Sequence, residues 1–362
     1  MKNMLKTLLA VLSSLVISVS AYAGELSVSG SAEATYIIGG TDDSNSKGLG
    51  VSNELNFTAS GEFGNGYTWS YSMELDGAST ANDDTQLVLG LDNLGTAAIC
   101  ITECGLSTEL SYGVGAYGVG SDIINTGSIK FGSYDVSTYN NVQYHTPAGL
   151  LPFGIAAKVA YVPNTAAGQG SSAKEGNTIE NTTNNDGITT GSTTGIGTDA
   201  SMYQITATPI DGLTVGADYF RADGSTATSQ TPEGGNAFAK YAMGPVVIGY
   251  AMSEVAPAFS QTTGTAAAQR YETTAYGIQF AVNEDFSVSY NNEKSTKTTN
   301  AGITAGDTTA TKTRVETTVD TYQVAYNIGG ATLALVKSEA DNAGYTTNKE
   351  VSATLISLKM AF

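Results

Sequence analysis

Apolar and polar residues alternate with a period of two along most of this chain. Between positions 67 and 75, Tyr, Trp, Tyr, Met and Leu occupy the odd positions, and Thr, Ser, Ser and Glu occupy the even ones. Successive side chains of a β-strand point to opposite faces of its sheet, so this alternation predicts strands with one apolar and one polar face. Sixteen segments show the pattern: 25–37, 51–63, 66–76, 85–92, 96–102, 139–146, 152–162, 200–208, 212–222, 235–243, 245–256, 270–282, 285–294, 315–328, 331–340 and 349–362.

The connections between these segments alternate between short and long. Residues 64–65, 209–211 and 329–330 are short connections, whereas 103–138 and 163–199 are long ones. A transmembrane β-barrel has tight periplasmic turns and longer outer loops, whereas a β-sandwich has no reason to keep its long loops at one end. Sixteen strands also close a barrel that is too wide for side chains to fill. The sequence therefore predicts an all-β fold, a transmembrane antiparallel 16-stranded β-barrel with its apolar face toward lipid and its polar face toward water.

The first residues have the composition of a secretory signal peptide. Lys2 and Lys6 precede an apolar run over 8–19, and an Ala-Tyr-Ala cleavage site ends the segment. A membrane anchor is the alternative, but the run is shorter than the ~20 residues that a spanning helix needs. We therefore expect export with removal of residues 1–23 as a signal peptide, and a barrel formed by residues 24–362.

The charge and the rare residues of the chain exclude several function classes. Its 362 residues include 34 Asp and Glu against 16 Lys and Arg, which gives a net charge of -18. A nucleic-acid-binding protein needs basic residues to neutralise phosphates, so nucleic acid is excluded as a partner. One His and two Cys cannot build a zinc finger or a thiolate cluster, and no metal or cofactor is expected. The single His145 lies beside a turn without a nucleophile motif, so the chain is not expected to be an enzyme.

Three stretches of the chain carry a resemblance to a known family: the opening strand 25–30, the strand 139–144 followed by Pro147, and the terminal Phe362. Together with the alternating strands, they make residues 24–362 similar to the general porins of the Gram-negative outer membrane. The resemblance implies a passive diffusion channel for small hydrophilic solutes and ions in the cell outer membrane. It also implies a homotrimer that contacts outer-membrane lipid and lipopolysaccharide. In the family, a C-terminal aromatic residue is the signal that the outer-membrane assembly machinery reads, which gives Phe362 that role.

The family folds its third outer loop into the barrel, where acidic loop residues narrow the pore opposite a basic cluster on the wall. The third long connection of this chain is 103–138, so the resemblance places the inward-folded loop there. The Pro-Glu-Phe-like signature usual in that loop is missing, and the assignment rests on loop order and length. The acidic residues expected at the constriction are Glu103, Glu109, Asp122 and Asp135.

The arginine-rich wall of the family is absent from this sequence, because the first four predicted strands contain no Lys or Arg. A pore lined mainly by carboxylates concentrates cations and repels anions, so we expect a weakly cation-preferring pore. The alternative is that most of these charges are solvated and have no selective role. Strand phase assigns to the pore wall the acids Glu33, Glu54, Glu62, Glu74, Asp218 and Glu293 and the bases Lys158, Lys240 and Lys359, with Lys337 as a further base.

The two cysteines, Cys100 and Cys104, lie where the fifth predicted strand meets the third long connection. An exported chain with an even cysteine count favours a local disulfide, and two reduced, buried thiols are the alternative. In an extended strand, residues four apart are too distant to bond, so a bridge requires the strand to end there.

Two other features bear on function. Residues 163–199 are rich in Gly, Thr, Ser and Asn, and their low hydrophobicity predicts a mobile outer loop. The alternative function is a non-channel surface-exposed β protein, such as an adhesin or an array protein. That class is expected to show a short internal repeat, and none is found in the sequence.

Overall fold

The computed structural model describes most of the chain after the predicted signal peptide. The described residues are 24–39, 47–76, 83–101, 104–119, 123–124, 134–163, 199–223, 229–257, 259–260, 267–300 and 312–362. The predicted signal peptide 1–23 lies outside them, as do nearly all of the predicted mobile loop 163–199 and the two loop acids Glu103 and Asp122.

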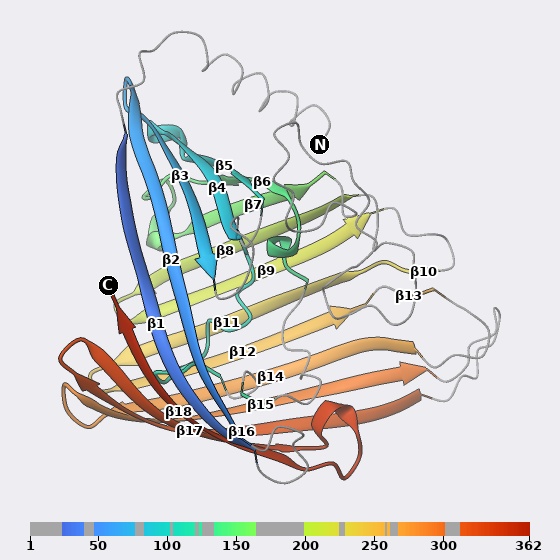
Figure 1. Ribbon diagram of the computed structural model, residues 1–362. Helices are drawn as coiled ribbons and strands as arrows, with labels where there is room; N and C mark the ends of the chain where they lie inside the picture. Colours follow the sequence, from blue (N-terminus) through green and yellow to red (C-terminus); the bar gives the residue numbers. More distant parts are fainter. Residues whose placement is uncertain are drawn as a thin grey trace.

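Sixteen antiparallel strands form one closed barrel (Figure 1). The predicted fold class is therefore confirmed. Two further strands, β10 (Ser229–Gln230) and β13 (Phe259–Ser260), pair with each other outside the barrel wall. The barrel strands are β1 (Glu25–Gly39), β2 (Lys47–Gly64), β3 (Tyr67–Asp76), β4 (Asp83–Leu91), β5 (Thr96–Cys100), β6 (Asn141–His145), β7 (Ala156–Val162), β8 (Asp199–Ile210), β9 (Leu213–Asp223), β11 (Glu233–Met243), β12 (Val246–Ala256), β14 (Ala267–Ala281), β15 (Phe286–Asn300), β16 (Lys312–Ile328), β17 (Ala331–Asp341) and β18 (Val351–Ala361).

The barrel closes where its first strand meets its last. In Figure 1, β1 (blue) lies beside β18 (red), and the two pair from Ser31 opposite Ala361 to Gly39 opposite Ala353. The backbone N–H and C=O groups of Gly30 exchange hydrogen bonds of 2.8 and 2.9 Å with the terminal Phe362. Closure pairs each strand on both edges, which is the condition for crossing a membrane with strands.

The wall turns its apolar side chains outward. Along β16, Tyr322 and Val324 are 51% and 38% exposed, whereas the intervening Thr321 and Gln323 are 0% and 3% exposed. A water-soluble barrel has the opposite arrangement, with apolar residues inside. The exposed apolar face is the one expected for a barrel that meets lipid. No helix in the described residues is long and apolar enough to cross a membrane.

Strand ends differ from the sequence prediction where the alternation is hidden. β2 begins at Lys47 instead of residue 51. Gly48 and Gly50 have no side chains, so the alternation of apolar and polar residues is not visible in this part of the strand. The statement that the first four strands contain no Lys or Arg is therefore wrong, although Lys47 lies opposite the outward-facing Ile38. β15 continues to Asn300 instead of residue 294. Residues 295–300 are polar on both faces of the strand, so the alternation does not mark them as part of it.

Short 3-10 helices interrupt the connections. They are η1 (Asp92–Leu94), η3 (Val136–Thr138), η4 (Pro152–Gly154) and η5 (Ala343–Tyr345). η4 occupies the beginning of the predicted strand 152–162, and β7 therefore starts only at Ala156. Pro152 lies in the first turn of η4, and Phe153 has a positive φ of 59°, so the backbone there is not extended.

Candidate functional site

The described part of the third long connection lies against the inner face of the barrel. We call residues 104–119 the inner segment. Its partners are polar side chains that alternate along their strands with exposed apolar ones, so they point inward. The bonds join Thr108 N and Oγ1 to Asp218 (2.6 and 2.7 Å), Lys240 Nζ to Gly113 O (2.6 Å), Asn291 Nδ2 to Val114 O (2.8 Å), Gly115 N to Gln279 Oε1 (3.2 Å) and Tyr117 N to Gln323 Oε1 (3.1 Å).

Apolar packing adds to these hydrogen bonds. Tyr112 of the inner segment is fully buried among inward-facing side chains that include Phe238 and Ala275. Farther along the same connection, Ile123 and Ile124 pack in a second cluster with residues of β16, β17 and β18. The third connection therefore follows the inner wall from β9 to β18.

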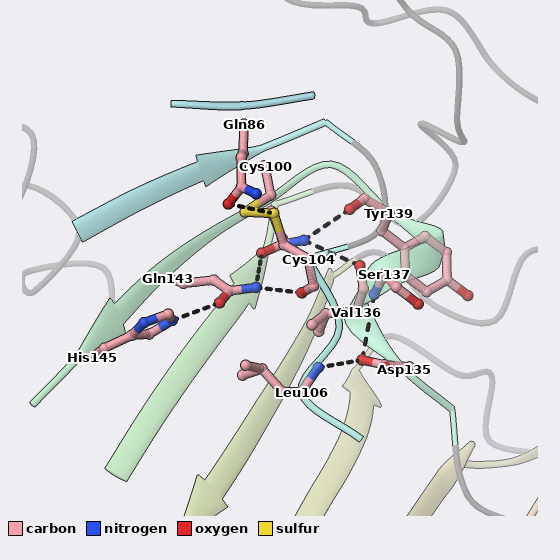
Figure 2. Close-up of a disulfide and its surroundings, with 11 residues drawn as sticks. Gln86, Cys100, Cys104, Leu106, Asp135, Val136, Ser137, Tyr139, Gln143 and His145 are labelled. Atoms are coloured by element: carbon pink, nitrogen blue, oxygen red, sulfur yellow. Dashed lines mark hydrogen bonds between the residues drawn. A yellow bond between two sulfur atoms is a disulfide. The ribbon is translucent and has the colours of Figure 1, made fainter. Parts of the chain in front are cut away.

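A disulfide and a partly buried carboxylate hold the base of this connection (Figure 2). Cys100, the last residue of β5, is bonded to Cys104, with 5.8 Å between their Cα atoms. The carboxylate of Asp135 accepts hydrogen bonds from Leu106 N at 2.9 Å and Ser107 N at 3.1 Å. These contacts join the outgoing and returning ends of the connection.

Inward-facing polar residues of β6 complete the base. Gln143 donates through Nε2 to the carbonyl oxygen of Cys104, and its Oε1 lies 2.8 Å from His145 Nε2 (Figure 2). Asn141 donates to the carbonyl oxygens of Val136 and Tyr139. His145 thus belongs to the polar network that supports the third connection.

The predicted constriction acids fall into three groups. Glu103 and Asp122 lie outside the described residues. Asp135 uses its carboxylate to accept backbone N–H groups at the base of the connection. Glu109 is partly buried in the inner segment, and its N–H donates to Ser107 Oγ at 3.3 Å.

Two of the predicted pore-wall residues hold the inner segment. Asp218 is 6% exposed, and both of its carboxylate oxygens also accept hydrogen bonds from Asn236 Nδ2 at 2.9 Å. Lys240 donates to the carbonyl oxygen of Gly113. Both side chains face inward as their strand phase predicted, but each is bonded to the loop. Four amide side chains also bind the inner segment, and the sequence analysis did not identify them: Asn236, Gln279, Asn291 and Gln323. In the sequence they are marked only by an amide at an inward strand position.

Four of the remaining predicted wall acids, Glu33, Glu54, Glu62 and Glu74, lie on β1, β2 and β3. Glu33 accepts a hydrogen bond from Ser357 Oγ, and Glu54 accepts one from Ser31 Oγ at 3.2 Å. Glu74 is 8% exposed on the same inward phase. Nearer the short turns, Glu25 and Glu62 line a cavity of about 550 Å³ together with Ser60, Thr68 and Ser70.

Basic side chains are scarce on the inner face of β1–β6. Within the described residues of β1–β6, Lys47 is the sole Lys or Arg, and it has the outward phase. Lys158 of β7 and Lys359 of β18 have the inward phase, opposite Gln204 and Glu33. Glu293 is fully buried on the inward phase of β15.

Lys337 does not face the pore. Its ammonium forms an ion pair with Glu339 on the outer face, and its side chain is 55% exposed. The inward positions of β17 are occupied by small or apolar residues, among them Val336, which pack under the third connection. Sequence analysis assigned Lys337 to the inner face because inward positions are usually polar. In β17 the inward positions are not, so the assignment of Lys337 was wrong. Arg270 and Arg314 also point outward, where they form ion pairs with Glu254 and Glu272.

The comparisons with known proteins agree with this architecture. No family model matches the sequence, and no curated protein matches it. Solved structures match over nearly the whole chain. OmpT, an outer membrane protein of Vibrio cholerae in its trimer form, is 14% identical, with 94% of this chain and 100% of that chain covered and a TM-score of 0.62. An anion-selective porin from Comamonas acidovorans is 12% identical, with 94% and 100% covered and a TM-score of 0.62. OmpF of Salmonella typhi, in complex with daunomycin, is 12% identical, with 95% and 100% covered and a TM-score of 0.60. The chain therefore has the fold of the bacterial outer-membrane porins.

Proposed function

We propose that this chain is a passive diffusion channel of the outer membrane for small hydrophilic solutes and ions. The observation that carries the proposal is the polarity of the closed wall, which is apolar outside and polar inside. Such a wall places a hydrated passage through an apolar layer, and transport through it requires no bond chemistry. The porin fold of the neighbouring structures supports the same function.

We further propose that the passage prefers cations. Hydrogen bonds join the inner segment to β6, β8, β9, β11 and β14–β16. Four of the predicted wall acids, Glu33, Glu54, Glu62 and Glu74, lie on the inner face of β1–β3. This face is lined by Glu, Ser and Thr. Fixed carboxylates in a narrow passage raise the local concentration of cations and repel anions.

Planar-bilayer recording in a KCl gradient tests both parts. We expect channel openings with a reversal potential of cation sign. Replacing three inward acids together, Glu54→Gln, Glu62→Gln and Glu74→Gln, is expected to lower the K⁺/Cl⁻ permeability ratio at least ~2-fold, because fixed wall charge sets the local ion concentrations.

A matched control removes the same number of charges from the outer face. Glu254→Gln, Glu316→Gln and Glu339→Gln in one protein are expected to leave the permeability ratio at its wild-type value, since these side chains lie on the outward phase. An anion-signed reversal potential contradicts the cation preference. Absence of conductance contradicts the channel and favours the non-channel surface protein.

We also propose a homotrimer embedded in outer-membrane lipid and lipopolysaccharide. The neighbouring OmpT structure is a trimer form, and the outer wall of this chain offers a broad apolar surface that includes Leu49 and Val51, 86% and 78% exposed. Sedimentation of the detergent-solubilised barrel is expected to give three times the protomer mass. A protomer-sized particle under mild detergent conditions contradicts the trimer and leaves the channel proposal standing.

A further inference from the structure

A second hollow lies in the inner wall, away from the cavity at Glu25 and Glu62. Its volume is about 510 Å³, within the range of small-molecule sites. Ala325 of β16 and Ala334 of β17 are paired across the sheet at the floor of the hollow. Their side chains are small, so they leave space above the wall at this point. Its other lining residues are Glu33, Ser357 and Lys359, then Gln279, Ser287, Asn327 and Thr332, and residues Gly115, Ala116 and Tyr117 of the inner segment.

Part of the hollow is lined by residues next to the short turns. Ser287 and Thr332 are the second residues of β15 and β17, and Asn327 is the next to last of β16. All three therefore lie where the strands meet the short connections. A solute that has passed the inner segment reaches this hollow as it leaves, so the inference rests on the proposed function.

The hollow carries one charge of each sign, and the two are not paired with each other. Glu33 and Lys359 stand directly opposite in the register of β1 and β18. The carboxylate of Glu33 nevertheless accepts its hydrogen bond from Ser357 Oγ, and no ion pair joins it to Lys359 in the part of the chain that the structure describes. Side chains directly opposite across antiparallel strands lie within about 5.5 Å at Cβ, so one small solute can contact both charges.

The roof of the hollow is held in place by the wall. Gly115 N donates to Gln279 Oε1 at 3.2 Å, and Tyr117 N donates to Gln323 Oε1 at 3.1 Å. Gly115 has a φ of 105°, a conformation that favours glycine. A site whose walls are already fixed loses little free energy in ordering when a solute binds.

We infer that this hollow is a binding site for small zwitterionic solutes, those with an ammonium and a carboxylate group close together. Such a solute can place its carboxylate at Lys359 and its ammonium at Glu33. A simple anion is repelled by Glu33, and a simple cation is repelled by Lys359, so neither gains both contacts. The amides of Gln279 and Asn327 supply neutral polar contacts around the two charges.

Glutamine and two of its derivatives test the inference with probes of similar size. Glutamine is zwitterionic, N-acetylglutamine is an anion, and glutaminamide is a cation. Calorimetry on the detergent-solubilised barrel measures their binding whether or not the protein conducts, and bilayer recording measures block of the ion current. We expect glutamine to bind and to block at lower concentration than either derivative.

Variants of the two charges make the test specific. Glu33→Gln and Lys359→Gln are each expected to weaken glutamine binding about tenfold, since each removes one charge-assisted hydrogen bond. The double variant Glu33→Lys with Lys359→Glu keeps both charges and is expected to restore binding. Lys158→Gln removes an inward lysine outside the hollow and is expected to keep the glutamine effect.

Three results overturn the inference: equal binding of all three probes, no glutamine binding in calorimetry, or loss of the effect in Lys158→Gln as large as in Lys359→Gln. Each of them leaves the channel proposal intact if ion conductance is present. Glutamine binding without conductance has the reverse meaning, since it supports the site and contradicts the channel.

Discussion

Asp218→Ala is expected to detach the inner segment from the wall and to raise both the single-channel conductance and the size of the sugars that pass. The wild-type carboxylate accepts hydrogen bonds from Thr108 N and Oγ1 and from Asn236, all at 2.6 to 2.9 Å and away from solvent. Hydrogen bonds to a charged group contribute about 1.5–3 kcal/mol each, so losing them removes ~3 kcal/mol or more of anchoring. The measurements are bilayer conductance and liposome swelling with sugars of increasing size.

Asp218→Asn separates anchoring from charge. Its amide oxygen can still accept from Thr108, so the inner segment is expected to stay in place and conductance to remain near the wild-type value. The result that contradicts the anchoring role is an Asp218→Ala protein with the conductance and sugar cutoff of the wild type. Equal effects of both substitutions assign the change to the lost charge instead.

The barrel could be predicted because its cause is local. Alternation of apolar and polar residues follows from the pleat of each strand, and the alternation of short and long connections follows from the two sides of a membrane. The prediction failed at Lys47 and at Asn300, where glycines and polar runs give the two faces no contrast. The seam between β1 and β18 joins the two ends of the chain, yet the even strand count already implied it.

The contacts of the inner segment could not be predicted, because they join residues far apart in sequence. Thr108 is 110 residues from Asp218, and Tyr117 is 206 residues from Gln323. Strand phase placed Asp218 and Lys240 inside the barrel. It could not show that both side chains form hydrogen bonds with the inner segment. On β17, Ala334 and Val336 occupy inward positions where polar residues are expected, because the third connection packs over them. For the same reason Lys337 was assigned to the wrong face.

Some residues that make the hollow were visible in the sequence, but their combination was not. Glu33 and Lys359 both followed from phase, as an acid and a base of the pore wall. Their direct opposition depends on the register of the closing strands, which no local pattern determines. The alanines opposite each other at its floor gave no polar signal at all.

Gly249→Ala is expected to disrupt the inner segment through shape alone. A Cβ atom at this position of β12 would lie 1.9 Å from the carbonyl oxygen of Tyr112. The obstacle is backbone, which cannot rotate away, so the segment must shift and the packing of Tyr112 with Phe238 is lost. Forcing an extra methyl group into a packed region costs about 1–3 kcal/mol. We expect chymotrypsin to cleave the folded variant after Tyr112 and to spare this residue in the wild type, where it is fully buried.

Gly48→Ala is the matched control, since it adds the same methyl group at an inward position of a wall strand. Its nearest atom is the side-chain Cγ2 of Ile37 at 3.3 Å, which can move by the few tenths of an ångström required. This variant is expected to keep Tyr112 protected and the conductance unchanged. Because the two substitutions are chemically identical, a difference between them isolates the close approach of the inner segment to β12. Equal protection of Tyr112 in both proteins contradicts that approach and, with it, the position of the inner segment on which the pore geometry depends.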